Sequence, residues 1–177
     1  MKTSHSSQPL HIKLTKAVAA VCLAAVMGAD ARAELKPGDK FPDLAGFKLE
    51  GKLPETLKGK IVIVDFWASW CLPCAASFPV LEELHQRYKD RDVVIVGINV
   101  DEKPGKMETF LKKHPVAFSI VRDAQQKLVS VANVETMPTS FILDATGKVR
   151  FIHNGFHGDE TKQQYIREIE SLMKAQP

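Results

Sequence analysis

A run of β-branched and aromatic residues that leads directly into a pair of cysteines constrains the fold of this chain more than any other feature. The segment 61–67 reads Ile-Val-Ile-Val-Asp-Phe-Trp, a pattern typical of strands that are buried on both faces. Cys71 and Cys74 follow a short loop, and apolar residues then recur at helical spacing over 78–88. The pattern predicts a buried strand, a loop, and a helix that carries the two cysteines at its N-terminal end.

Strand and helix signals alternate through the rest of the chain. We expect a loop-rich entry with one short hairpin over 34–60, strands at 93–100, 117–121, 139–143 and 149–153, and helices at 75–89, 104–114, 124–132 and 159–173. Residues 144–147 are suited to a turn between the last two strands. The alternation predicts an α/β domain with a central, largely parallel sheet, flanked by helices and extended by an antiparallel hairpin.

The first 33 residues have the pattern of a secretory signal peptide. A basic start is followed by the uncharged, 13-residue apolar stretch 17–29 and by Ala31-Arg32-Ala33, an A-x-A cleavage site. We therefore predict cleavage after Ala33, export to the periplasm, and one mature domain over 34–177. An uncleaved membrane anchor is the alternative, but a spanning helix needs about 20 apolar residues.

Removal of the leader changes both the charge and the cysteine count. The net charge of +3 belongs to the leader, because residues 34–177 hold 20 basic and 20 acidic side chains. A neutral domain argues against a nucleic-acid partner. Cys22 leaves with the leader, so Cys71 and Cys74 remain as a pair whose short loop gives little chain-entropy stabilisation. The pair indicates redox chemistry; a structural zinc site usually needs four protein ligands, and no second cysteine pair is present.

Three segments resemble one known family. Residues 65–74 are similar to the active-site segment of thioredoxins, Pro79 stands where thioredoxins bend the following helix, and Met137-Pro138-Thr139 resembles their cis-proline loop. The segments 36–60 and 104–121 resemble the TlpA/ResA-type exported thioredoxins, so the resemblance covers essentially all of 34–177. It implies a thioredoxin-like fold with a helix–strand insert before the cis-proline loop.

The residues that would carry the chemistry follow from these patterns. Cys71, at a helix N-terminus, is expected to be the more acidic thiol and the nucleophile, while Cys74 resolves the mixed disulfide. Asp65 is the candidate base for Cys74, and burial should raise its pKa. The substrate-binding set is expected to comprise Trp70, Leu72, Pro73, Met137, Pro138 and Thr139. Without the resemblance a trans Pro138 is equally plausible; with it, a cis bond is expected.

Two positions depart from the family pattern. Ser77 stands where members of the subfamily often carry a glutamate three residues after the second cysteine, and Thr136 replaces a glycine that usually precedes the cis-proline by two residues. The four histidines of the mature domain, His85, His114, His153 and His157, lie in different segments and are interpreted as solvated surface residues.

The resemblance implies an exported thiol–disulfide oxidoreductase that exchanges disulfides with other exported proteins, for example in cytochrome c or copper-site maturation. We expect it to act as a reductant; an oxidant is the alternative, because the direction depends on the reduction potential, which the sequence does not fix. A membrane electron donor, a monomeric state, and the absence of any cofactor or metal are expected with it. A copper(I) chaperone that uses Cys71, Cys74 and Met137 as soft ligands is the alternative. A peroxidase ranks last, because no peroxidatic loop with threonine and cysteine after a proline is present.

Overall fold

The computed structural model describes residues 1, 2 and 34–175, and the long described segment belongs to one compact unit. Residues 3–33, and therefore nearly all of the predicted leader and its cleavage site, lie outside the described residues. Among the helices that are described, none is long and apolar enough to cross a membrane.

A six-stranded mixed sheet forms the centre of this unit, in the order β1-β4-β3-β2-β5-β6. Its strands are β1 (Glu50–Gly51), β2 (Ile61–Trp67), β3 (Val93–Asn99), β4 (Ser119–Arg122), β5 (Thr139–Leu143) and β6 (Val149–Asn154). The strands β2, β3 and β4 are parallel, whereas β5 runs antiparallel to β2 and β6 antiparallel to β5. Every residue of β2 is buried, Asp65 included, as its β-branched and aromatic pattern predicts.

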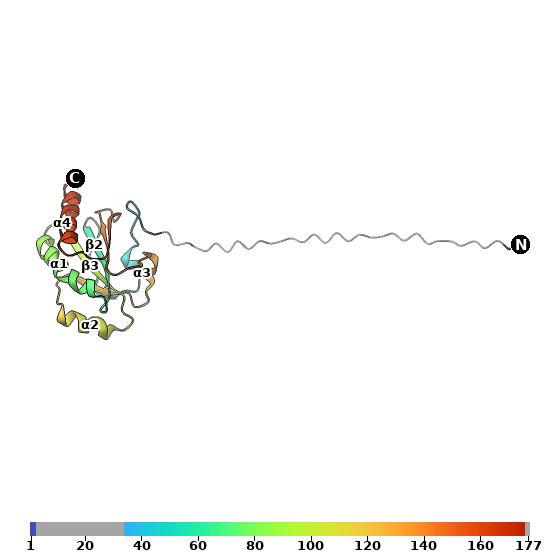
Figure 1. Cartoon of the computed structure of the whole chain (residues 1–177). Coiled ribbons are helices and arrows are strands. Elements are labelled where there is room, and N and C mark those ends of the chain that lie inside the picture. Colours follow the sequence, from blue (N-terminus) through green and yellow to red (C-terminus); the bar gives the residue numbers. More distant parts are fainter. Residues whose placement is uncertain (3–33, 176–177) are drawn as a thin grey trace. The chain divides into compact units, whose positions relative to one another are not determined.

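Helices flank the sheet on both sides. They are α1 (Leu72–Tyr88), α2 (Pro104–Lys113), α3 (Lys127–Val131) and α4 (Asp159–Lys174). Figure 1 shows α1 and α4 together on one side of the strands, and the short α3 on the other side. The strands and helices after β2 thus follow the expected α/β order, with α2 and β4 between β3 and the Met137-Pro138 loop.

The entry segment differs from its prediction. Residues 34–60 contain a 3₁₀ turn at Leu44–Gly46 and the two-residue β1, but no local hairpin within this described stretch. β1 instead pairs antiparallel with β4, and Lys40 forms an isolated bridge with Lys148. The predicted hairpin was wrong because backbone hydrogen bonds here are satisfied by distant segments, which local sequence patterns do not reveal.

The active-site helix begins earlier than periodicity alone indicates. It starts at Leu72, and Cys71 is its N-cap residue, so Pro73 falls in the first turn, where a missing N–H breaks no helical bond. The helix continues through Pro79 to Tyr88. Both cysteines are therefore positioned by the first turn of α1, as predicted.

An aromatic cluster joins β2 to two helices. The Trp67 ring lies 4.7 Å from that of Phe78 on α1 and 4.8 Å from that of Phe110 on α2, and the two phenylalanine rings are 5.0 Å apart. All three side chains are buried, and tilted or edge-on aromatic pairs add to the energy of burial. The cluster fixes α1, and with it the cysteines, against the end of β2.

Replacing Phe78 should test this anchoring role. Phe78→Ala removes a fully buried ring between Trp67 and Phe110, so we expect the free energy of unfolding to fall by about 3–5 kcal/mol. Phe78→Leu keeps most of the apolar volume and serves as the matched control, with a smaller loss. Urea denaturation followed by circular dichroism measures both, and equal losses for the two variants would contradict the role of the ring.

Candidate active site

Cys71 and Cys74 form a disulfide at the N-terminus of α1. The Cys71 sulfur accepts a hydrogen bond of 3.1 Å from the backbone N–H of Cys74, in the position of an N-capping group. A free N–H at the start of a helix stabilises negative charge, so after reduction this contact favours a Cys71 thiolate. Cys74 is completely buried. The geometry fits the predicted division into an attacking and a resolving cysteine.

Two exposed apolar side chains flank Cys71. Trp70 is 69% exposed and Leu72 is 84% exposed, and apart from Met1 they are the exposed large hydrophobic residues of the described chain. Pro73 is also exposed, whereas Cys71 itself is buried, with 5% of its surface exposed. An apolar rim around a reactive sulfur can contact a polypeptide that brings its own sulfur to Cys71.

The Met137-Pro138 peptide bond is cis, as the family resemblance implies. β5 begins immediately afterwards, and its register places Thr139 opposite Phe66, so the cis-proline lies at the end of the sheet where β2 leads to Cys71. The Thr139 hydroxyl donates to the Thr136 carbonyl oxygen at 2.9 Å. Pro138 and Thr139 are buried and Met137 is partly buried. The structure thus brings the two predicted substrate-binding segments to the same edge.

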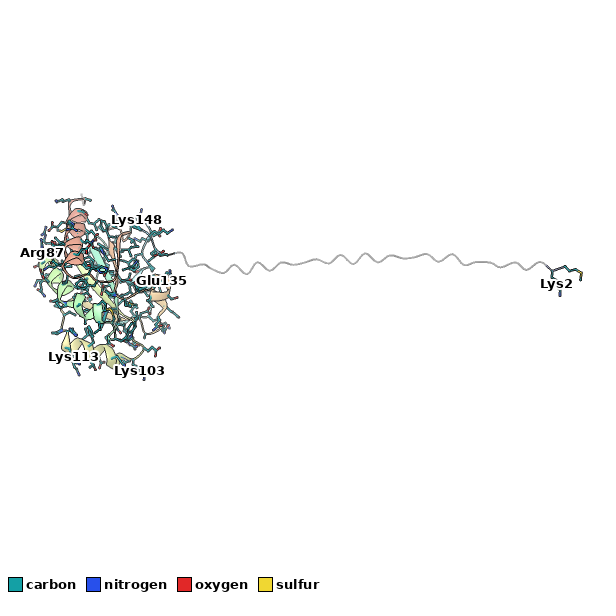
Figure 2. All side chains as sticks on the ribbon, in the orientation of Figure 1. Lys2, Arg87, Lys103, Lys113, Glu135 and Lys148 are labelled. Carbon is teal, nitrogen blue, oxygen red and sulfur yellow. A yellow bond between two sulfur atoms is a disulfide. The ribbon has the colours of Figure 1, made fainter. Side chains whose placement is uncertain are left out.

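Asp65 is buried in the middle of this region. It lies on β2 between Gly97 of β3 and Ser140 of β5, and only 1% of its surface is exposed. Burial raises the pKa of Asp65 to about 7, against the opposing effect of a hydrogen bond from Ser140. The charged side chains of Lys103, Glu135 and Lys148, in contrast, lie on the outside of the domain (Figure 2).

The hydrogen bonds of Asp65 extend through the Ser140 hydroxyl to a second hydroxyl, that of Tyr165. The Ser140 hydroxyl donates to Asp65 Oδ1 at 2.5 Å, and its oxygen lies 2.8 Å from the hydroxyl of Tyr165 on α4. Both residues are buried, and burial next to Asp65 raises the pKa of the Tyr165 hydroxyl, which therefore keeps its proton. Sequence reasoning missed both residues as parts of the site.

Asp101 is a further residue that sequence reasoning missed. Its carboxylate accepts hydrogen bonds from the backbone N–H of Ser69 at 3.1 Å and from the Ser69 hydroxyl at 3.0 Å, and Asn99 donates to it at 2.8 Å. Its backbone carbonyl accepts from Arg122. Asp101 thereby fixes the loop between Trp67 and Cys71. The available signal was an aspartate placed directly after the predicted strand 93–100.

Ser77 and Thr136, the two departures from the family pattern, have modest local roles. The Ser77 hydroxyl donates to the Cys74 carbonyl oxygen at 2.9 Å, so it is used within α1. Thr136 is exposed, and its carbonyl accepts the bond from Thr139. Neither residue supplies an ionisable group near the cysteines.

The histidines are less exposed than expected. Of the four histidines that the structure describes, His157 is exposed and the other three are partly buried. His153 is paired with Glu168 at 2.7 Å, with 12% of its side chain accessible. The interpretation as solvated surface residues was therefore wrong for His153, because β6 packs it against Tyr165 on α4. No group of three or more metal-ligating side chains occurs in the described part of the chain.

Comparison with known proteins identifies relatives of this site and fold. The chain matches the Redoxin family over residues 36–168. It is 33% identical to thiol-disulfide oxidoreductase ResA of Bacillus thuringiensis (strain Al Hakam) over 141 residues, which cover 77% of this chain and 80% of the relative.

Solved structures agree with this match. A putative thiol:disulfide interchange protein DsbE from Chlorobium tepidum is 35% identical, with a TM-score of 0.73 over 79% of this chain and 99% of the other. A secreted disulfide oxidoreductase of Mycobacterium tuberculosis is 25% identical, with a TM-score of 0.58 over 66% of this chain and 84% of the other. The comparisons confirm the thioredoxin-like fold and the thiol–disulfide oxidoreductase activity expected from the sequence.

The buried carboxyl should make stability depend on pH. Because the pKa of Asp65 rises from 3.8 to about 7 on folding, the folded protein holds a proton that the unfolded chain has lost between these values, and stability falls as pH rises through this window. Asp65→Asn should therefore increase the free energy of unfolding by up to about 4 kcal/mol above pH 7, where each pKa unit corresponds to about 1.4 kcal/mol.

Urea denaturation at pH 4 and at pH 8 measures this effect. At pH 4 Asp65 is protonated in the folded protein, so the variant and the original should differ little. Replacing the exposed Asp159 with asparagine provides a matched control without a buried carboxyl. The same difference at both pH values for Asp65→Asn would rule out a raised pKa.

Proposed function

This chain belongs to the Redoxin family and is a thiol–disulfide oxidoreductase of the ResA/DsbE type, and on that premise we propose that it is an exported reductant of protein disulfides. The observation that carries the proposal is the Cys71–Cys74 disulfide at the start of α1, which follows the strand that buries Asp65 and lies at the same end of the sheet as the cis Met137-Pro138 bond. The reduced pair would supply two electrons to a client disulfide.

The exchange takes place in two steps. The Cys71 thiolate attacks one sulfur of the client disulfide, and the other client sulfur leaves as a thiolate. Cys74 then loses its proton and attacks Cys71, which forms the protein disulfide and releases the second client sulfur. Asp65 accepts the Cys74 proton, and a pKa of about 7 suits this role because the carboxyl can take up and return a proton near neutral pH.

The client segment is proposed to dock along the cis-proline loop. The backbone of Met137 lies before β5, outside the strand ladders, and takes part in none of the loop hydrogen bonds of the described chain. An extended client segment can pair with it as an added strand, while Trp70, Leu72, Pro73 and Met137 contact its side chains. Pro138 and Thr139 hold this edge in place.

The proposal includes the compartment in which the protein acts and the direction of electron flow. The leader pattern over residues 1–33, together with the secreted relative from Mycobacterium tuberculosis, supports export with cleavage after Ala33 and action in the periplasm. A membrane electron donor would re-reduce the monomeric protein, and its clients would include proteins of cytochrome c or copper-site maturation. In cells quenched with acid and alkylated, most Cys71 and Cys74 should then be found as thiols.

Asp65→Asn should separate the two steps. At pH 7 the variant should resolve the mixed disulfide about 10- to 100-fold more slowly, since general-base catalysis is lost but a small fraction of the Cys74 thiol still ionises unaided. The disulfide dithiobis(nitrobenzoate) serves as the model client. Stopped-flow absorbance then measures the release of one thionitrobenzoate on attack by Cys71 and of the second on resolution by Cys74, as successive phases.

Alkylation of Cys71 is the control for this variant. In a Cys74→Ala background, iodoacetamide should modify Cys71 at similar rates with and without the Asp65→Asn substitution, because the helix N-terminus stabilises the thiolate. An unchanged second phase in Asp65→Asn would exclude Asp65 as the base.

Cys74→Ala should trap clients. Cys71 can still attack, but the mixed disulfide cannot be resolved, so exported extract should yield disulfide-linked adducts that dissociate with dithiothreitol. Cys71→Ala is the matched control and should give none. An empty Cys74→Ala trap, together with tight copper(I) binding by the reduced protein, would instead favour the copper chaperone.

A further inference from the structure

Two buried hydroxyls connect the candidate base to the last helix. Asp65, Ser140 and Tyr165 come from β2, β5 and α4, and they form a continuous chain with distances of 2.5 Å and 2.8 Å between successive oxygens. The β2–β5 register places Ser140 directly opposite Asp65, and the two side chains share the sheet face against which α4 packs. Burying three polar groups costs free energy, because each loses its hydrogen bonds to water, so their presence calls for a functional explanation.

The number of available protons sets the direction of this chain. A serine hydroxyl has one proton to donate, and here it is donated to Asp65 Oδ1. The Tyr165 hydroxyl must then donate to the Ser140 oxygen. In this arrangement both hydroxyls point toward the carboxyl, which stabilises its charged form.

The two carboxyl oxygens of Asp65 are thereby unequal. Oδ1 is held by Ser140, whereas Oδ2 is buried and has no hydrogen-bond partner among the described residues. Buried carboxylate oxygens are nearly always satisfied, so an unpaired one needs an explanation. A proton acceptor is such an explanation, because its oxygen must be free to receive the proton.

We propose that Ser140 and Tyr165 are positioning residues for Asp65: their directed hydroxyl chain holds Oδ1 and leaves Oδ2 as the oxygen that accepts the Cys74 proton. This inference rests on the proposed role of Asp65 as the base. When Cys74 ionises, its proton moves to Oδ2, and the Ser140 contact keeps the carboxyl in the same orientation until the proton is returned.

The other groups around Asp65 do not replace these hydroxyls. The residue opposite Asp65 on β3 is Gly97, which has no side chain to offer, and the first turn of α1 carries no acidic side chain. Beyond Tyr165, Glu168 of α4 is paired with His153 of β6. The hydrogen bond from Ser140 is the interaction that counteracts the effect of burial on the pKa of Asp65.

The pKa of Asp65 provides a direct readout of this role. In full-length protein with ¹³C-labelled aspartate carboxyl groups, the Asp65 signal is assigned by its loss in Asp65→Asn and titrated by NMR. Ser140→Ala should raise the Asp65 pKa by about one to two pH units, because a hydrogen bond to a charged group is lost. Tyr165→Phe should raise it by a few tenths of a unit, on the order expected from a cooperative bond.

Two conservative variants guard against general damage. Ser140→Thr keeps the hydroxyl and should restore an Asp65 pKa close to the original. Tyr88→Phe removes the hydroxyl of another buried tyrosine, which is bonded to Glu170 rather than to Ser140, and should leave the Asp65 pKa unchanged. An unchanged pKa in either Ser140→Ala or Tyr165→Phe overturns the proposal, as does an equal shift in Tyr88→Phe.

Kinetics of mixed-disulfide resolution distinguish a failure of this proposal from a failure of Asp65 as the base. The pH profile of the second thionitrobenzoate phase should move upward in Ser140→Ala and Tyr165→Phe by the same amount as the Asp65 pKa. If Asp65→Asn resolves the mixed disulfide normally, the proton step of the proposed function fails. The NMR titration then still decides whether the hydroxyl chain controls the carboxyl.

Discussion

The pairing of β2 with β5 is the constraint on which the rest of the site depends. One antiparallel register places Asp65 opposite Ser140 and Phe66 opposite Thr139. It thereby brings the strand that leads to Cys71 beside the strand that follows the cis-proline. Because side chains alternate between the faces of a sheet, a shift of one residue would move Asp65 away from α1 and α4. The buried run of β2 makes such a shift unfavourable.

This register carries a cost in stability. Asp65 lies in the most buried strand of the sheet, where a charged carboxylate loses its hydration and stability declines as pH rises toward 7. The aromatic cluster around Trp67 contributes apolar burial on the same face of β2 and offsets part of this cost. The packing of Trp67 at the end of β2 thus helps the fold to tolerate the unfavourable burial of Asp65 within the same strand.

Local patterns were enough for the elements, but not for their long-range contacts. The β-branched run and the helical spacing after it predicted β2 and α1, and the cysteine pair followed from its position between them. The Asp65–Ser140–Tyr165 chain joins residues separated by 75 and 25 positions, so no periodicity could reveal it. The predicted entry hairpin failed for the same reason, since β1 pairs with β4 across the chain.

The buried aspartates differ in how many of their carboxylate oxygens are hydrogen-bonded. Asp123 accepts hydrogen bonds from the backbone N–H groups of Lys127 and Val129, one on each oxygen, and both oxygens of Asp101 are likewise occupied. These two carboxylates therefore serve to hold a helix start and a loop. Asp65 keeps one oxygen unpaired although it is buried just as deeply. A carboxyl with both oxygens engaged positions the backbone, whereas the unpaired oxygen of Asp65 is available for the proton transfer proposed above.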